Sequence, residues 1–376
     1  MPAPRHVLLN ALYFAPGESG GTETYLRGLV PALAREFPDV RLTVASTRSG
    51  VAALRSDGWD EFTALVALPC EDGERVRRQW AEQVLLPREA RRLNADIVHS
   101  LASLAPVYPG TGAVVTLHDV TFLLQPTFGR TTTVGMGLLV RAAARRADAL
   151  IAVTAAARDE ICRVLHVDPA RFTVVHHGHE PTREVDPASA QELRARYELG
   201  DSRVVLCVAA KRPHKNQELL IRAAADLEAD TAIVLVGHAE PYELDLRALA
   251  SELGLTDRIR FPGFVSAAEI EGLWRVAGCA AFPTLGEGFG LPILEALARG
   301  VPVAASDLAV LREVGGELPF YFDPHSPADA ARAIRLALDD SKTRRLGPAH
   351  AASFSWAASA KGTFSAYERA LAHEVR

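Results

Sequence analysis

The chain is poor in the features that mark several large classes of protein. Its four cysteines, Cys70, Cys162, Cys207 and Cys279, are scattered without a Cys-x-x-Cys pair. This pattern favours reduced thiols in a cytoplasmic protein over a disulfide framework or a zinc site. No apolar run approaches the ~20 residues that a transmembrane helix needs, and the apolar segment after His6 is too short for a secretion signal. The sequence therefore predicts a cytoplasmic protein without a membrane-spanning helix.

The net charge and the absence of certain motifs argue against further classes of function. With 41 basic and 46 acidic residues the formal net charge is −5, so the chain lacks a global positive field and we expect no nucleic acid as partner. The sequence holds no Asp-x-Asp pair that would bind a diphosphate through a metal, and no Gly-x-Ser-x-Gly nucleophile turn. Its first glycine-rich turn departs from the Gly-x-Gly-x-x-Gly pattern, which argues against a dehydrogenase.

What the chain does have is a regular alternation of short apolar runs with longer helical patterns. This alternation predicts an α/β fold of doubly wound parallel sheets. With 376 residues, 48% of them hydrophobic, the chain is long enough for two such domains. The expected strands are residues 6–12, 41–46, 63–68, 96–100, 113–118, 148–153 and 172–176 in the first half, and 203–209, 231–236, 258–261, 279–283 and 302–305 in the second.

Glycine and proline place the boundary between the two domains. A strand is expected to end near Gly178, and two prolines then bracket a polar stretch, as in linkers. We therefore expect an N-terminal Rossmann-like domain over residues 1–182 and a C-terminal one over residues 183–354. The remaining segment, residues 355–376, has a helical pattern.

The most informative segment places two carboxylates around a Gly-x-Gly turn. Pro292 suits the first position of a helix because its φ is fixed and it has no N–H to lose. Glu287 would then lie in the preceding loop and Glu295 in the first helical turn, with an anion site between them at the positive end of the helix dipole. Carboxylates accept hydrogen bonds from sugar hydroxyls, so the pattern favours a nucleotide-sugar over acids placed only for the dipole. The residues assigned to the phosphates are Gly288, Phe289, Gly290 and Leu291.

Three other turns at expected strand ends carry candidate site residues. Lys215 lies in a cationic turn between a strand and a helix, a sound phosphate site, although a solvated charged turn is the alternative. His118 closes a strand, where α/β proteins build their sites, but a lone histidine there is also often structural. The pair Gly20-Gly21 precedes a helix, and could bring backbone amides against a phosphate or sugar or form a plain tight turn.

The segment from Glu287 to Glu295 resembles the Glu-x7-Glu signature of retaining glycosyltransferase family 4. Members of that family adopt the GT-B fold, in which two Rossmann-like domains face each other across a cleft. The resemblance implies that Glu287 contacts the transferred sugar, Glu295 the ribose and Lys215 the diphosphate, and that His118 bonds the donor sugar. It also implies that the N-terminal domain binds the acceptor, that the C-terminal domain binds the nucleotide-sugar, and that the C-terminal helix crosses back to the N-terminal domain. By the same resemblance the donor site includes Gly20, Gly21, Lys211, Arg212, Phe264 and Val265.

The resemblance implies a retaining hexosyltransferase that uses a nucleoside-diphosphate sugar and needs no metal or other cofactor. The expected catalytic residues are His118, Glu287 and Lys215, and the acceptor would be a hydroxyl of a glycan, a lipid-linked oligosaccharide or a small molecule. The Pro-x-Lys-Asn turn before Gln217 resembles the mannosyltransferase-rich branch, which favours mannose from GDP-mannose. The alternatives are a GT-B sugar-nucleotide 2-epimerase and a non-catalytic sugar-nucleotide-binding protein.

Two arginine-rich helical segments in the first half bear on membrane contact. Residues 75–92 are rich in arginine, and Arg141, Arg145 and Arg146 lie among apolar residues. A basic amphipathic helix can rest on an anionic bilayer. Peripheral contact with the inner face of a membrane and plain solvated helix faces are both compatible with this pattern.

Overall fold

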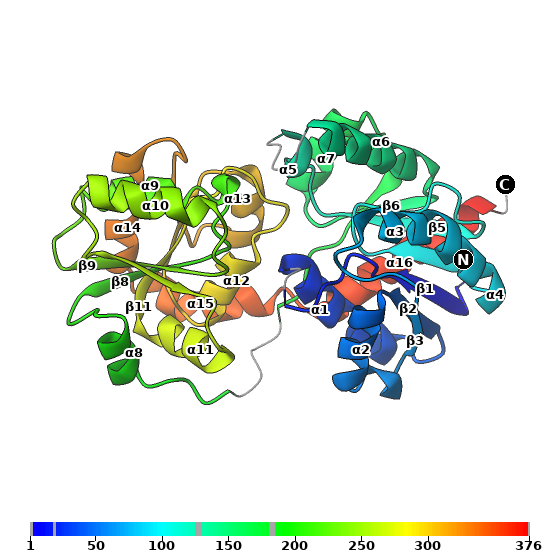
Figure 1. The fold of residues 1–376 in the computed structure, drawn as a ribbon, viewed down its shortest axis with the longest axis horizontal. Helices are drawn as coiled ribbons and strands as arrows, with labels where there is room; N and C mark the ends of the chain where they lie inside the picture. Colours follow the sequence, from blue (N-terminus) through cyan, green and yellow to red (C-terminus); the bar gives the residue numbers. More distant parts are fainter. Residues whose placement is uncertain (1–2, 18–19, 125–129, 180–184, 375–376) are drawn as a thin grey trace. The chain divides into compact units, whose positions relative to one another are not determined.

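A computed structural model describes residues 3–17, 20–124, 130–179 and 185–374, and divides the chain into two compact units. Unit 1 comprises Met1–Gly178 together with Phe354–Arg376, and unit 2 comprises His179–Ser353. The boundary expected at residue 182 lies outside the described residues. Within unit 1, the C-terminal helix (red in Figure 1) lies among elements from the N-terminal half of the chain.

Among its described residues, unit 1 contains a parallel sheet of seven strands in the order β3-β2-β1-β4-β5-β6-β7. The strands are β1 (His6–Asn10), β2 (Arg41–Ser46), β3 (Ala64–Ala67), β4 (Ile97–Ser100), β5 (Gly112–Leu117), β6 (Ala149–Ala152) and β7 (Phe172–Val174). In the register, Val7 of β1 lies opposite Leu42 on one side and Ile97 on the other. The strand order reverses between β1 and β4, and open α/β sheets bind ligands at such a point, beyond the carboxyl ends of the strands.

The described residues of unit 2 form a parallel sheet of six strands with the same pattern, β10-β9-β8-β11-β12-β13. The strands are β8 (Arg203–Val208), β9 (Thr231–Val236), β10 (Ile259–Gly263), β11 (Ala277–Phe282), β12 (Val303–Ser306) and β13 (Phe320–Phe322). The order reverses between β8 and β11. The predicted doubly wound parallel α/β fold is therefore confirmed in both units. β13 was not among the expected strands, because three residues after a proline are too short to show a strand pattern.

Helices cover both faces of each sheet (Figure 1). In unit 1 these are α1 (Gly21–Glu36), α2 (Arg48–Ser56), η1 (Trp59–Glu61), α3 (Arg75–Trp80), η2 (Ala81–Leu85), α4 (Leu86–Leu93), α5 (Thr121–Leu124), α6 (Arg130–Arg146), α7 (Ala155–Leu165), η3 (Pro169–Arg171) and α16 (Trp356–Glu374). In unit 2 they are α8 (Ala190–Arg196), η4 (Pro213–Lys215), α9 (Gln217–Ala223), α10 (Tyr242–Glu252), α11 (Ala267–Val276), α12 (Leu291–Ala298), α13 (Ala309–Gly315), α14 (Pro327–Leu338) and α15 (Lys342–Ala352).

The sheet of unit 1 separates two apolar cores because successive strand side chains point to opposite faces. Val7 and Leu9 of β1 belong to the core under α1 and α16, whereas Leu8 belongs to the core under η2 and α4. Trp356 at the start of α16 is buried, and a Cβ added to Gly28 of α1 would lie 2.0 Å from its ring. The glycine therefore lets α1 and α16 approach closely.

Candidate active site

The turn after β8 carries Lys215 at the carboxyl edge of the sheet in unit 2. The chain forms the single 3₁₀ turn η4, and Asn216 follows it in the left-handed conformation with φ 54°. Asn216 Nδ2 donates to the carbonyl oxygens of Pro283, at 3.0 Å, and Pro324, at 2.9 Å. These bonds tie the Lys215 turn to the end of β11 and to the loop after β13. No role was predicted for Asn216, although asparagine is, after glycine, among the residues that best tolerate this backbone conformation.

Glu287 follows β11 and meets Lys215 at the point where the strand order reverses. Lys215 Nζ donates to Glu287 Oε2 at 2.6 Å, and the two side chains remain 24% and 21% exposed. A cavity of about 30 Å³ borders both residues. Ion pairs that retain solvent contact contribute only about 0–1 kcal/mol, so Lys215 can exchange this carboxylate for another anion at little cost. The structure thus brings together two residues that are 72 positions apart in the sequence.

The N-terminus of α12 borders the same cavity through Gly290 and Pro292. Gly290 precedes the helix with φ 95°, and an added Cβ would approach Leu311 to 2.7 Å, so both conformation and space require glycine. The helix begins at Leu291, and Pro292 occupies the second position rather than the predicted first. The positive end of the helix dipole and the nearby ammonium group of Lys215 both favour the binding of an anion at this place.

The prediction that Glu295 lies in the first turn of α12 is wrong, because the helix begins at Leu291 and Glu295 is one turn further along. Its side chain is half-buried, and desolvation raises the pKa of Glu295, against the effect of nearby Arg299. Arg299 Nε is itself paired with Glu271 Oε2 at 2.9 Å. Among the described residues no donor lies within hydrogen-bond distance of the Glu295 carboxylate, which leaves it able to accept bonds from a ligand.

Lys211 and Arg212, the two other cations assigned to the donor site, differ sharply in burial. Lys211 is fully buried, and its Nζ donates to the Gly237 carbonyl at 2.5 Å and lies 3.8 Å from Glu243 Oε2. Desolvation lowers the pKa of Lys211. The assignment of Lys211 to the donor is therefore corrected, because its ammonium holds internal partners and has no exposed surface. Arg212 is half-exposed and pairs with Glu240 at 2.6 Å, so it stays a candidate.

The loop that carries the donor-site candidates Phe264 and Val265 begins at the end of β10 (Ile259–Gly263). Gly263 has φ 77°, and an added Cβ would meet no atom within 4 Å. Phe264 is 69% exposed and stacks on His238, with ring centroids 4.6 Å apart, whereas Val265 is buried. Phe264 can therefore reach a ligand with its side chain, and Val265 only with its backbone.

His118 follows β5 in unit 1 and is 9% exposed. Its Nε2 lies 2.8 Å from the Leu101 carbonyl oxygen, so this nitrogen donates and Nδ1 is the acceptor of a neutral imidazole. Burial lowers the pKa of His118, which favours the neutral form. Tyr25 packs against the ring at right angles, with centroids 4.9 Å apart. Asp119, the next residue, accepts on Oδ1 from the Thr121 amide at the start of α5, at 2.8 Å.

The glycine pair of the first turn lies at the start of α1. Gly20 has φ 55° and ψ −131° and precedes the helix, whose first residue is Gly21. An added Cβ at Gly20 would meet no atom within 4 Å, so the need for glycine here is conformational. Residues 18–19 of the same turn lie outside the described residues. Gly20 and Gly21 at the start of α1 and His118 after β5 thus belong to unit 1, and the other candidates belong to unit 2.

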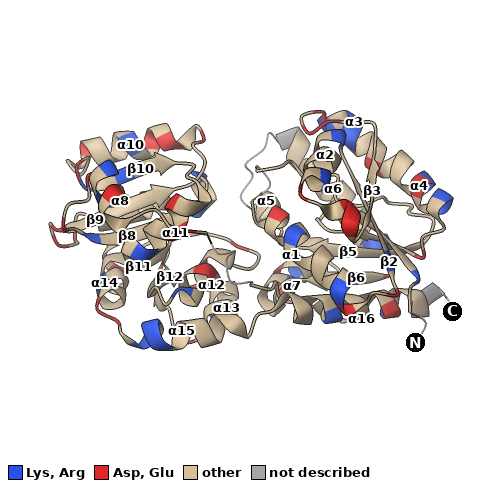
Figure 2. Cartoon of the chain, turned by 90° about the horizontal axis from the view of Figure 1, so that it is seen from below, with Lys and Arg blue, Asp and Glu red and all other residues tan. Residues whose placement is uncertain are grey.

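The arginine-rich helices and the possible metal ligands can be assessed from the described residues. Figure 2 shows basic segments on α3, α4 and α6. Arg141 donates to the Val164 carbonyl, and Arg146 stacks over Tyr108, which gives both a role inside unit 1. Across the described ranges, no helix is both long and apolar enough to cross a membrane. Nor do the described residues bring three or more His, Cys, Asp or Glu side chains together as metal ligands.

Solved structures show which class of fold the two units make. The chain superposes on sucrose-phosphate synthase from Thermosynechococcus elongatus with a TM-score of 0.78 at 19% identity, covering 98% of this chain and 100% of that one. It superposes on Anabaena HepE, solved with UDP and glucose, with a TM-score of 0.72 at 20% identity, covering 95% and 97%. These likenesses establish the GT-B fold, as the sequence predicted.

Sequence comparison identifies the family. Residues 19–183 match the family model described as glycosyltransferase family 4, and residues 189–348 match that described as glycosyl transferases group 1. Over 99% of this chain and 90% of the relative, the sequence is 30% identical to a D-inositol 3-phosphate glycosyltransferase of Streptomyces griseus. The chain belongs to glycosyltransferase family 4.

Other relatives align over a smaller part. A D-inositol 3-phosphate glycosyltransferase of Corynebacterium glutamicum is 33% identical, over 61% of this chain and 59% of its own length. The serotype-specific mannosyltransferase WbdA of Escherichia coli is 32% identical, over 60% of this chain and 29% of its own length. The chain thus spans less than two thirds of these curated relatives.

Proposed function

We propose that the protein transfers a hexose from a nucleoside-diphosphate sugar to a hydroxyl acceptor, with retention of the anomeric configuration. The observation that carries this proposal is the Lys215–Glu287 pair beside the N-terminus of α12, at the switch point of the sheet in unit 2. The donor diphosphate would displace Glu287 from Lys215 and lie against the helix N-terminus. Glu287 would then accept hydrogen bonds from hydroxyls of the sugar.

The charges at this site suit the breaking of a bond between a sugar and a diphosphate. As the sugar–oxygen bond to phosphate breaks, negative charge grows on the leaving group, and a preorganised cation such as Lys215 stabilises it. Arg212 would supply a second cation by leaving Glu240. The acceptor oxygen forms the new bond to the sugar, and its proton passes to the leaving phosphate. In this proposal no metal takes part and no carboxylate acts as a nucleophile.

The remaining residues would hold the rest of the donor. Glu295 is assigned to the ribose hydroxyls, because its half-buried carboxylate is open to donors. His118 would accept a hydrogen bond from a sugar hydroxyl on Nδ1, and the amides of the Gly20-Gly21 turn would contact the phosphates. The backbone around Val265, together with Phe264, would cover the base.

The names of the relatives guide the choice of sugar and acceptor. WbdA is a mannosyltransferase, which favours mannose from GDP-mannose. HepE was solved with UDP and glucose, so a uridine donor also needs a test. Several relatives are D-inositol 3-phosphate glycosyltransferases, which adds a phosphorylated small molecule to glycans and lipid-linked oligosaccharides as acceptor candidates. Peripheral membrane contact through the arginine-rich helices stays a separate proposal.

The first experiment compares the melting temperature of the protein with GDP, UDP, ADP and dTDP. A ligand that binds only the folded state stabilises it and therefore raises the melting temperature. At a ligand concentration 100 times the dissociation constant, the stabilisation is about 2.7 kcal/mol. We expect one nucleotide to stand out, and a flat response to all four would contradict the proposal. Incubating the matching nucleotide-sugar alone then separates the functions: formation of an epimer without acceptor would indicate an epimerase.

Glu295→Ala tests the ribose assignment with the nucleotide found in that panel. Loss of a charged acceptor should weaken nucleoside diphosphate binding by roughly 1.5–3 kcal/mol in calorimetric titration. Glu295→Gln, which keeps one acceptor oxygen, should lose less. Parental affinity in the alanine variant would show that the ribose lies elsewhere.

A further inference from the structure

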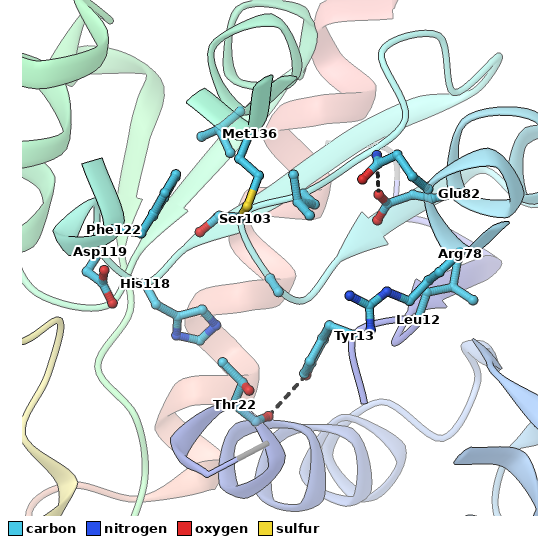
Figure 3. Close-up of a pocket in the computed structure, with 14 residues that line it drawn as sticks. Leu12, Tyr13, Thr22, Arg78, Glu82, Ser103, His118, Asp119, Phe122 and Met136 are labelled. Carbon is cyan, nitrogen blue, oxygen red and sulfur yellow. Dashed lines mark hydrogen bonds between the residues drawn. The ribbon is translucent and has the colours of Figure 1, made fainter. Parts of the chain in front are cut away.

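Each unit has a glutamate whose pKa is raised by desolvation, and the two carboxylates are held differently. In unit 1, Glu82 lies in the π-helical turn η2 and lines a pocket of about 280 Å³ (Figure 3). It accepts from Asn10 Nδ2 at 2.8 Å and from Gln79 Nε2 at 3.1 Å. In unit 2, no described residue donates a hydrogen bond to the carboxylate of Glu295 on α12. A desolvated acceptor without a donor is uncommon in proteins and needs a physical reason.

Arg299 is the partner that the sequence offers to Glu295. It follows four residues later, and a glutamate four positions before a basic residue on a helix can form an ion pair with it. Among the described residues, three other glutamate–arginine pairs at this spacing form, with nitrogen–oxygen distances of 2.7 or 2.8 Å: Glu23 with Arg27, Glu218 with Arg222, and Glu243 with Arg247. Arg299 behaves differently, because its Nη1 donates to the backbone carbonyl of Glu295, at 2.8 Å, and not to the carboxylate.

Glu271 of helix α11 binds the guanidinium of Arg299 instead. Arg299 Nε donates to Glu271 Oε2 at 2.9 Å, and Nη2 donates to the other carboxylate oxygen, so that two parallel bonds join the pair. Trp274 lies three residues further along α11, and its ring centroid is 5.6 Å from the guanidinium carbon of Arg299. Residues three apart share a helix face, so one face of α11 supplies both contacts.

Arg299 remains within reach of the Glu295 side chain, since one of its nitrogens already contacts the backbone of that residue. After desolvation, which raises the pKa of Glu295, the charge of Arg299 is the next largest influence and lowers it. Arg299 and Glu271 are each only 16% exposed. A guanidinium that lost its partner at this depth would be a poorly solvated charge, which is costly, and pairing with Glu295 would remove that cost. The carboxylate of Glu295 therefore stays free only while Glu271 holds Arg299.

Resting on the proposed transferase function, we propose that Glu271 and Arg299 are positioning residues for the nucleotide-sugar site. Glu271 holds Arg299 away from Glu295, and this keeps the Glu295 carboxylate available for the hydroxyls of the donor's ribose. Neither Glu271 nor Arg299 borders the cavity beside Lys215. They act on the donor only through Glu295, so the affinity for the nucleotide depends on an ion pair that the nucleotide does not touch.

The first test measures nucleoside diphosphate binding to the full chain by calorimetric titration, with the nucleotide that raises the melting temperature most. Glu271→Gln keeps the size of the side chain and removes the charge that holds Arg299. The apparent affinity falls in proportion to the molecules that keep Glu295 free, so we expect about tenfold weaker binding if about nine tenths of them form the new pair. Glu271→Gln/Arg299→Met also lacks the competing cation and should bind within about threefold of the parent. A general disturbance of α11 would grow with the second substitution instead of being reversed by it.

Two further variants control this comparison. Glu228→Gln makes the same chemical change in the pair of Glu228 with Arg335, 3.2 Å apart, before the amino end of β9, and should bind the nucleotide as the parent does. Adding Glu271→Gln to Glu295→Ala closes a double-mutant cycle. With the carboxylate of Glu295 already absent, Arg299 has nothing to block, so Glu271→Gln should cause no further loss of affinity. Additive losses would mean that Glu271 acts by another route and would overturn the proposal.

A crystal structure of ligand-free Glu271→Gln tests the displacement of Arg299 without any nucleotide. We expect the guanidinium within about 4 Å of the Glu295 carboxylate, the distance of an ion pair. Arg299 in its parental position, parental affinity in Glu271→Gln, no recovery in Glu271→Gln/Arg299→Met, or an equal loss in Glu228→Gln would each overturn the proposal. Nucleotide binding separates it from the proposed function. If the parent binds a nucleoside diphosphate and Glu295→Ala weakens it while Glu271→Gln does not, only the positioning role is wrong. If the parent binds none, the transferase function is wrong and the positioning role with it.

Discussion

The two units share one strand order but present opposite kinds of chemistry at their switch points. In unit 2 the groups are charged and partly exposed, as in the Lys215–Glu287 pair. In unit 1 the histidines at this edge of the sheet are buried and neutral: His99 bonds Thr116 and Tyr367, both at 2.8 Å, and burial lowers the pKa of His99 to about 3. The pKa of His118 is lowered for the same reason. The topology therefore fixes where a site lies, and the residues at the strand ends decide what it can bind.

The largest expected effect is on turnover in unit 2. Lys215→Ala removes the cation beside the leaving diphosphate and should lower kcat roughly 10²–10³-fold, about 2.7–4 kcal/mol, the loss typical of one preorganised donor. Stability should change by less than about 1 kcal/mol, because the pair with Glu287 is partly exposed. Steady-state kinetics and a melting curve check both quantities.

Arg203→Ala is the matched control for Lys215→Ala. It breaks a comparable pair, with Asp339, at the start of β8, which is the opposite end of the strand from Lys215. Its turnover should stay parental. Equal kinetic losses in the two variants would mean that general disturbance of the sheet, and not the missing charge, lowers the rate.

The second effect is a loss of stability at low pH, which we expect in unit 1 and not in unit 2. An unfolded histidine binds a proton below pH 6.5 whereas buried His99 does not, so unit 1 loses stability as pH falls below 6.5. At pH 5 the loss from His99 alone is about 2 kcal/mol, since 1.5 pH units are worth 1.36 kcal/mol each. The pKa of His177 is lowered too, by burial first, and adds to the loss. Hydrogen exchange followed by mass spectrometry should show unit 1 opening between pH 7.5 and 5 while unit 2 stays protected.

The pKa shift of Glu82 in unit 1 changes stability in the opposite direction to that of the histidines, and this sharpens the test. The raised pKa of Glu82 stabilises the folded state as pH falls from 6 toward 4.5, which offsets part of the histidine effect. In Glu82→Gln the offset is absent, so the acid loss of unit 1 should be larger than in the parent. Simultaneous opening of both units would show that the buried histidines do not control the difference.

The third effect is a gain of stability in the same variant. Raising the pKa of Glu82 from 4.5 to about 6 costs the folded state about 2 kcal/mol above pH 6, because 1.5 units are worth 1.36 kcal/mol each. Glu82→Gln should therefore be more stable than the parent by about that amount at pH 7.5, and the gain should vanish below pH 4.5. Denaturant unfolding at the two pH values measures it. A destabilised variant at pH 7.5 would show that the hydrogen bonds of Glu82 stabilise the fold by more than its burial costs.

The comparison also shows which features the sequence could predict. Both sheets could be predicted from the alternation of apolar runs, and the turn at Glu287 could be predicted from its prolines and glycines, because these signals are local in the sequence. The contact of Lys215 with Glu287 needs two distant strand ends to become neighbours, and it was not predicted: the resemblance to a family assigned the two residues to different parts of one donor. Burial of Lys211 had no local signal either, since its partner Glu243 lies on α10. The pocket at Glu82 was missed because the π-turn that directs it interrupts an ordinary helical pattern.

The smallest expected effect concerns how unit 2 holds the base, by backbone or by side chain. Phe264 is mostly exposed, and an exposed ring contact contributes about 0.5–1.5 kcal/mol at most, so Phe264→Ala should weaken nucleoside diphosphate binding less than about tenfold. Gly263→Ala adds one methyl group into open space and therefore acts only through its φ of 77°, which L-residues rarely adopt. If the backbone after β10 reads the base, this small change should weaken binding more than loss of the whole Phe264 ring. The opposite order in calorimetric titration would assign the base to the aromatic side chain.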